Sequence, residues 1–243
     1  MTARCLAIFM VSMMAFGSIG CSGAQVQPTD PQRDPWEAYN RKIHAFNTGV
    51  DRYLMKPVAK GYDTVMPDAP QRGVRNFFRN LSYPVTFLNL LLQGKPEAAM
   101  DATGRFLVNT TLGLGGFFDV ASKGGLPRFD EDMGQTLAVW GWTESRYLVM
   151  PFIGPYTVRD LLGRSFYGYF HPISYMVREY DAYYLIAIDL VTLRAELLSF
   201  DTQIQNASDP YVLIRDVYLQ NREFKIYDGD PPAPDYDALL EDF

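Results

Sequence analysis

Few residues of this 243-residue chain have the types and spacing that a catalytic or metal-binding site requires. The two histidines, His44 and His171, stand far apart and lack the spaced cysteines or histidines of a zinc site, so we interpret both as structural. The acidic run at residues 130–132 is predicted to be a solvated turn. The glycine-rich segment 113–116 fails the dinucleotide-binding pattern, because the third glycine of that motif would fall at Phe118. The sequence therefore predicts no catalytic residues, no metal and no cofactor, and hence a protein that is not an enzyme.

The clearest predicted chemistry belongs to Cys21. It follows Arg4, an apolar run over residues 5–16 and a small-residue stretch over 17–20, which is the order of an export signal. A cysteine directly after such a stretch resembles the bacterial lipoprotein signal, in which the thiol receives a diacylglycerol and the new amino terminus is acylated. Residues 1–20 are therefore predicted to be a lipoprotein signal peptide, with Cys21 as the lipidated residue.

Two residues beside the cysteine refine this prediction. Ser18 stands where lipoprotein signals usually carry leucine, which leaves open a signal cut elsewhere and a free thiol at Cys21. Ser22 follows the cysteine in place of the aspartate that favours retention in the inner membrane. We therefore expect a lipid-anchored protein at the outer membrane, facing the periplasm.

Composition excludes several classes of protein. The chain has 22 Lys+Arg against 28 Asp+Glu, a formal net charge of −6, which argues against a nucleic-acid binder. Hydrophobic residues make up 48% of the chain, too many for a disordered protein. Two cysteines are too few for a disulfide-rich scaffold. Aromatic residues reach 14%, an excess that a membrane interface would suit.

Helical signals dominate the mature chain. Asp34 and Pro35 suit the start of a helix that continues with an apolar face to Tyr53. Another helix is predicted to end near Arg222, with Ser208 or Asp209 as its cap and Pro210 as its first residue. Further helical segments are predicted over 74–81, ending or kinking at Pro84, then over 96–108 and 179–200, with a turn at 94–96. We expect a mainly α fold in a single domain over 34–227, preceded by a lipidated tether over 21–33 and followed by an acidic flexible tail over 228–243.

Four uncharged segments of 12 to 15 residues are the most informative pattern: 80–94, 106–118, 147–158 and 165–177. None reaches the ~20 residues of a spanning helix, so no conventional transmembrane helix is predicted in the mature chain. Each segment suits either the core of a soluble globule or an element that dips into one leaflet. In the first segment we assign membrane contact to Phe87, Leu88, Leu91 and Leu92.

Basic residues frame these segments, and they have two interpretations. If the segments enter a leaflet, lipid phosphates would suit these residues, which are Arg79, Lys95, Arg105, Arg146, Arg159, Arg164 and Arg178. They could equally be ordinary surface residues.

Several short stretches, in order along the core, resemble the MlaA (VacJ) family of outer-membrane lipoproteins. They are Asp34-Pro-Trp-Glu-Ala-Tyr-Asn-Arg41 with Phe46-Asn47, Gln93-Gly94, Arg105-Phe-Leu-Val-Asn-Thr110, Gly113-Leu-Gly-Gly-Phe-Phe-Asp-Val120, Leu148-Val-Met-Pro-Phe152 with Arg159-Asp160, and Ser208-Asp-Pro-Tyr-Val-Leu-Ile-Arg215. The resemblance covers roughly 34–227.

The resemblance implies a ring-like helical protein seated in the inner leaflet of the outer membrane. It implies an amphipathic channel that removes phospholipids misplaced in the outer leaflet and passes them to a soluble periplasmic carrier, MlaC, which maintains lipid asymmetry. It also implies binding to a trimeric porin.

A family hairpin beside the channel matches residues 106–128 here. On that basis we assign lipid-channel or hairpin roles to Asn109, Leu112, Gly113, Leu114, Gly115, Gly116, Phe117 and Phe118. An alternative function is a structural or adaptor lipoprotein that only scaffolds a porin, and another is a lipid-modifying enzyme. The acidic tail is either solvated or a docking element for the carrier.

Overall fold

The computed structural model describes residues 32–176 and 179–232, and helices dominate both ranges. The predicted signal peptide, Cys21 and residues 233–243 of the predicted tail lie outside the described residues. The elements in chain order are α2 (Glu37–Val50), η1 (Asp51–Met55), α3 (Lys56–Val65), α4 (Asp68–Leu92), α5 (Pro96–Thr111), α6 (Val120–Lys123), α7 (Met133–Val139), β1 (Tyr147–Met150), β2 (Gly154–Thr157), α8 (Val158–Phe170), α9 (Ile173–Met176), α10 (Glu179–Glu196), η2 (Leu197–Phe200), α11 (Asp201–Gln205) and α12 (Pro210–Ile226). The prediction of a mainly α fold is confirmed.

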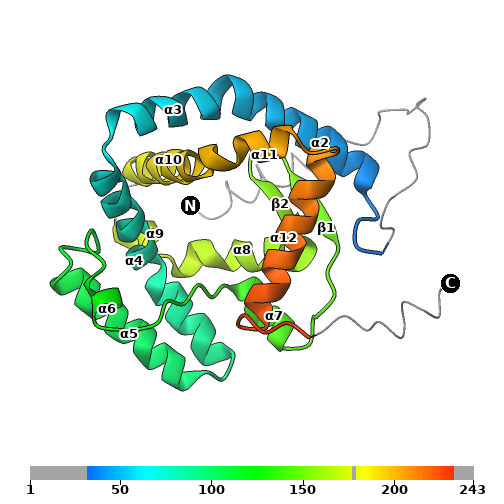
Figure 1. Cartoon of the computed structure of the whole chain (residues 1–243). Helices are drawn as coiled ribbons and strands as arrows, with labels where there is room; N and C mark the ends of the chain where they lie inside the picture. The colour runs from blue at the N-terminus through cyan, green and yellow to red at the C-terminus, as the bar shows by residue number, and fades with distance from the viewer. Residues whose placement is uncertain (1–31, 177–178, 233–243) are drawn as a thin grey trace.

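The helices follow one another around a ring in Figure 1. Helices α2 and α3, joined by the π-helical turn η1, run along the top, α4 descends on the left, α8 crosses the lower part and α12 rises on the right. Helix α10 packs against α3 inside this outline, and α5 packs against α4 outside it. Because η1 continues α2 into α3 without a loop, one long helical path forms almost half of the rim.

The two strands form an antiparallel hairpin in which Tyr147 pairs with Thr157 and Met150 with Gly154. Two asparagines of α2, two helical turns apart, bind the free edge of β1. Asn40 donates to the Tyr147 carbonyl (3.2 Å) and accepts from the Val149 amide (2.8 Å). Asn47 donates to the Met150 carbonyl (2.9 Å) and accepts from the Phe152 amide (2.8 Å). The two asparagine side chains thus form the hydrogen bonds to backbone groups of β1 and Phe152 that a third strand would otherwise provide.

Local signals located several element boundaries correctly. Asp209 caps α12 by accepting from the Tyr211 and Val212 amides, and Pro210 opens that helix. Gly94, with a φ of 76°, makes the turn between α4 and α5, and Pro96 is the first residue of α5. These features were predictable because they depend on residues adjacent in sequence.

Two predictions from local signals were wrong. Helix α4 is not interrupted at Pro84 but continues to Leu92, although proline removes one backbone hydrogen bond. Buried neighbours such as Tyr83 and Leu90 pack against other elements and hold the helix together there. Asp34 does not cap α2, which begins at Glu37 after Trp36. Its carboxylate is instead fully buried and accepts from Asn40 (2.8 Å), Tyr211 and Arg215 (3.5 Å).

The interior is unusually polar. Two small apolar clusters form the core: Tyr83, Leu90, Ala99 and Ala102, and Tyr147, Val149 and Tyr211. Charged side chains are buried beside them, among them Arg105, Arg159 and Arg215. All three tryptophans, Trp36, Trp140 and Trp142, are exposed together with many phenylalanines, tyrosines and leucines. The distribution is therefore inverted relative to a soluble domain, in which charges seldom lie inside.

The buried carboxylate of Asp34 provides a test of this organisation. Asp34→Ala should lower the free energy of unfolding by about 3–5 kcal/mol, because the Arg215 and Tyr211 side chains lose a partner that water cannot replace. Urea unfolding of the purified protein in detergent, followed by circular dichroism, measures this value.

The matched control is Asp216→Ala. Asp216 binds the same arginine at 2.8 Å but on the protein surface, so its loss should cost less than about 1 kcal/mol. Equal costs for the two variants would contradict the importance of the buried contact.

Candidate functional site

The segment after α5 is held by Arg105, whose side chain is only 2% exposed. Its guanidinium donates to the Tyr83 hydroxyl of α4 (2.7 Å), the Leu126 carbonyl (2.5 Å) and the Asp119 carboxylate (2.8 Å). One arginine therefore joins α4, the residue that caps α6 and the segment that follows α6. The expectation that Arg105 contacts lipid phosphates or lies on the surface is wrong, because these partners use its donors inside the fold.

Asp119 is the acceptor at the centre of this arrangement. Besides Arg105 it receives bonds from the Ser122 hydroxyl (2.6 Å), Arg128 (2.6 Å) and the Asn109 amide (3.2 Å), and it caps α6. Burial alone would raise the pKa of Asp119, but the donors outweigh it and hold the pKa well below its usual value. The carboxylate therefore stays charged, and the loop remains clamped at physiological pH.

The glycines of the loop are required by close backbone approach. A Cβ on Gly113 would lie 2.2 Å from the Phe118 carbonyl oxygen and 2.4 Å from that of Asn109. Gly116 has a φ of +99°, and a Cβ there would lie 2.4 Å from the Asn80 side chain. The predicted hairpin is thus a tight loop pressed against α4, and Leu114 also adopts a left-handed φ of 52°.

The apolar residues of this loop project outward. Leu112, Leu114, Phe117 and Phe118 are exposed, with Leu114 at 69%. Phe117 stacks on Phe77 of α4, with ring centroids 5.3 Å apart. The predicted site residues therefore divide in two. Asn109, Gly113, Gly115 and Gly116 build the loop, and Leu112, Leu114, Phe117 and Phe118 present an apolar surface.

The residues assigned to membrane contact lie on a different part of α4. Phe87, Leu91 and Leu92 are exposed, whereas Leu88 is half-buried. Leu91 lies fourteen residues after Phe77, or about 20 Å along the helix axis. The structure therefore does not bring these four residues together with the loop. They form one apolar surface near the end of α4, and the loop forms another where Phe117 packs on Phe77.

A second polar cluster joins α7, α8 and α12. Arg222 binds Asp132 through both terminal nitrogens (2.6 and 3.0 Å) and Asp160 (2.9 Å), and the Tyr218 hydroxyl donates to Asp160 (2.9 Å). The prediction of a solvated turn at residues 130–132 was wrong, because Glu131 is buried and Asp132 both caps α7 and holds α12. Sequence reasoning missed this cluster, since its members are distant along the chain.

The remaining candidate groups, the two histidines and Arg159, make contacts that hold the fold together. His171 is buried and stacks on Tyr167, with centroids 4.7 Å apart, and His44 lies edge-on to Tyr211. Burial lowers the pKa of both histidines, which favours their neutral forms. Arg159 donates to the Trp142 and Thr143 carbonyls (2.8 Å each), so it too is an internal donor and not a surface group. Across residues 32–176 and 179–232, no group of three or more metal-ligating side chains comes together.

The beginning of the predicted acidic tail contacts the fold. The Lys95 ammonium binds the Asp228 carboxylate at 2.6 Å, and the Gly229 amide donates to the Phe224 carbonyl at 2.8 Å. Within the part of the chain that the structure describes, no helix has both the length and the apolar character needed to cross a membrane.

Comparison with known proteins places these features in context. The family model described as MlaA lipoprotein matches residues 32–225. A protein of Escherichia coli K12 named intermembrane phospholipid transport system lipoprotein MlaA is 33% identical over 241 residues, which cover 96% of each chain. The protein of the same name in Haemophilus influenzae is 33% identical over 227 residues, or 91% of each chain. An uncharacterized protein of Rickettsia prowazekii is 37% identical over 195 residues, 79% of this chain and 78% of the relative.

A solved structure agrees with these sequence matches. It is described as the structural basis for maintenance of bacterial outer membrane lipid asymmetry, and it superposes with a TM-score of 0.71 at 32% identity. The match covers 79% of this chain and 98% of that one. The chain therefore belongs to the MlaA lipoprotein family.

Proposed function

We propose that this protein is an outer-membrane lipoprotein that removes misplaced phospholipids from the outer leaflet and so maintains lipid asymmetry. The observation that carries the proposal is the inverted distribution of side chains, with arginines and carboxylates inside and large apolar side chains outside. Relatives that share a third of its residues over most of their length are named as intermembrane phospholipid transport lipoproteins.

The exposed apolar residues support a position within one leaflet. Phe87, Leu91 and Leu92 of α4 and the loop residues Leu114 and Phe118 would contact acyl chains, because exposing so much apolar surface to water is unfavourable. Exposed tryptophans such as Trp140 suit the headgroup region. The protein would then be embedded to part of the bilayer depth without spanning it.

Charged groups inside the helical outline support a polar path for headgroups. Asp189 of α10 is accessible to water, yet surrounding protein raises its pKa, against the opposite effect of Arg164 on α8. An amphipathic channel needs solvent-accessible polar groups, such as this carboxylate, on the side that contacts lipid headgroups. The loop over 112–118 would form part of the wall, held in place by the Arg105–Asp119 clamp.

The proposal includes no chemical step, since moving an intact lipid requires only a path. It includes a trimeric porin and the carrier MlaC as partners, with the acidic tail as a docking element for the carrier.

Co-purification of the lipidated protein from membranes should recover a porin and intact phospholipid. Recovery of a modified lipid would favour an enzyme, and recovery of a porin without lipid would favour a scaffold.

The lipid anchor is tested at the two cysteines. Cys21→Ala should abolish acylation, because no thiol remains at the predicted cleavage site, and should release the protein from the outer membrane. Metabolic labelling with an alkyne fatty acid and membrane fractionation measure both effects.

Cys5→Ala is the matched control, because Cys5 lies within the apolar run of the signal. It should leave labelling unchanged. Normal labelling of the Cys21→Ala variant would contradict the anchor assignment.

Leaflet seating is tested by placing a charge on the exposed face of α4. Leu91→Asp should impair lipid retrieval while the protein stays folded and anchored, because a carboxylate in the hydrocarbon region costs about 2–3 kcal/mol. Lipid asymmetry is measured as phospholipid exposure in the outer leaflet of cells that express the variant.

Asn221→Asp adds the same charge at an exposed polar position of α12 and serves as the control. It should support normal retrieval. If the Leu91→Asp protein retrieves lipid as well as this control, the embedded-segment idea fails and a porin scaffold becomes the better hypothesis.

A further inference from the structure

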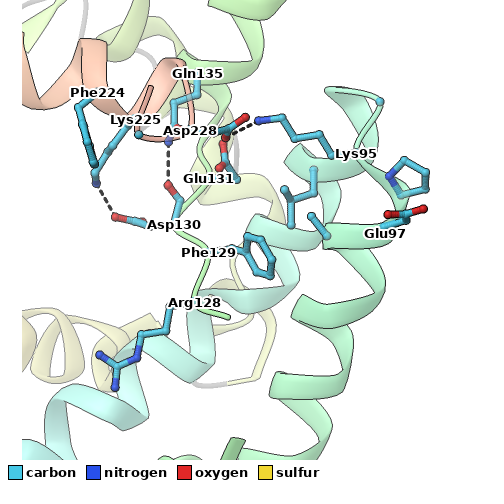
Figure 2. Close-up of a pocket in the computed structure, with 15 residues that line it drawn as sticks. Lys95, Glu97, Arg128, Phe129, Asp130, Glu131, Gln135, Phe224, Lys225 and Asp228 are labelled. Atoms are coloured by element: carbon cyan, nitrogen blue, oxygen red, sulfur yellow. Dashed lines mark hydrogen bonds and ion pairs between the residues drawn. The ribbon is translucent and has the colours of Figure 1, made fainter. Parts of the chain in front are cut away.

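A cavity of about 650 Å³ has Arg128, which also binds Asp119, in its wall, and none of the loop residues 112–118 line it. Its walls come from the α4–α5 turn, the segment at residues 128–131, Gln135 of α7 and the end of α12. Figure 2 shows Lys95, Glu131 and Asp228 close together at one side of it, with Phe129 below them. The volume falls within the range of small-molecule sites.

Two residues that line the cavity, Gln135 and Glu131, carry acceptors that the described residues do not fully satisfy. Gln135 is 1% exposed, and its Oε1 has no hydrogen-bond partner among the described residues. Glu131 is buried, and the Gln93 amide donates to its carboxylate at 2.9 Å, while the Oε1 atom of Gln93 is also without a donor. Burial raises the pKa of Glu131 despite Gln93 and Lys95, so its negative charge is incompletely matched. Such a cluster suits a ligand that brings several N–H donors.

Two ammonium groups lie at the rim. Lys95 binds Asp228 at 2.6 Å, and Lys225 binds Asp130, so each uses one of its three donors in the contact. The ammonium of Lys95, which Figure 2 shows beside Glu131, keeps two further donors for an anion. Three cationic and four acidic side chains line the cavity in total, which favours a zwitterion over a simple anion and disfavours the acidic segment 233–243 as the occupant.

Part of the cavity wall is apolar and adjoins the proposed membrane surface. Leu90, Phe129 and Phe224 line the walls. Leu91 and Leu92, the next residues of α4, are exposed, and the exposed Trp140 donates its indole N–H to the Leu92 carbonyl at 2.9 Å. A tryptophan ring at the end of an exposed leucine run is characteristic of headgroup depth.

We propose that this cavity binds the headgroup of an ethanolamine phospholipid, with the ammonium at Glu131 and Gln135 and the phosphate at Lys95. The inference rests on the proposed function, because that function supplies the lipid. The acyl chains would leave along Phe129 and Leu90 toward the exposed face of α4. The cavity would thus give the protein a preference among the phospholipids that it moves.

The test uses the full lipidated protein in detergent, titrated by calorimetry with dihexanoyl phosphatidylethanolamine and dihexanoyl phosphatidylglycerol. The ethanolamine lipid should bind more tightly. Glu131→Gln should weaken its binding about tenfold, because the charged acceptor is lost while a neutral oxygen remains for Gln93. The same variant should leave binding of the glycerol lipid unchanged.

The matched control is Glu97→Gln, which removes an exposed carboxylate from the same cavity. It should leave both affinities unchanged. Equal weakening by the two variants would show a general charge effect and overturn the proposal, as would equal binding of the two lipids by the unaltered protein. Tight binding of butylamine, which has an ammonium and no phosphate, would also overturn it.

A second measurement does not depend on any variant. An ethanolamine lipid with a diazirine in its acyl chain should label peptides containing Phe129 or Leu90, and labelling confined to other segments would contradict the site. Transfer of both lipids between vesicles separates this inference from the proposed function. Transfer without a binding preference would contradict the headgroup site alone. A binding preference without transfer would contradict the transport function.

Discussion

The structure depends on buried and partly buried contacts between arginines and carboxylates, which join helices whose apolar sides face outward. Arg222 joins α12 to Asp132 and Asp160, Arg194 joins α10 to Asp51 and Asp201, and Arg105 holds Asp119. Desolvation makes each charge costly to bury unless its partners are in place. The helices are therefore held in one arrangement by directional bonds, and their apolar residues remain available to a membrane.

This constraint links the fold to the proposed function. A domain with an apolar core has few large hydrophobic side chains left to place outside, whereas this chain exposes its three tryptophans and most of the loop at 112–118. The arginine clamp lets the loop present apolar side chains although the loop itself lacks regular structure. The exposed carboxylate of Asp189, whose pKa is raised by nearby protein, is then available to lipid headgroups.

Two Asp-Pro pairs show how far local patterns reach. Asp209-Pro210 and Asp34-Pro35 carry the same signal for a helix start. Asp209 caps its helix as predicted, but Asp34 is withdrawn into the fold by Tyr211, Asn40 and Arg215, which lie 177, 6 and 181 residues away in sequence. The acidic run at 130–132 fails for the same reason, since its partner Arg222 is 90 residues away.

The sequence by itself determined the helical character, the turn at Gly94, the cap at Asp209 and the candidate anchor at Cys21, because each depends on residues adjacent in the chain. It also showed that Arg105 and Arg159 frame uncharged segments. Only the tertiary structure decided that these arginines lie inside and the phenylalanines and leucines outside. Whether a charge is buried depends on the free energy that distant partners return for its desolvation, and no local pattern contains that information.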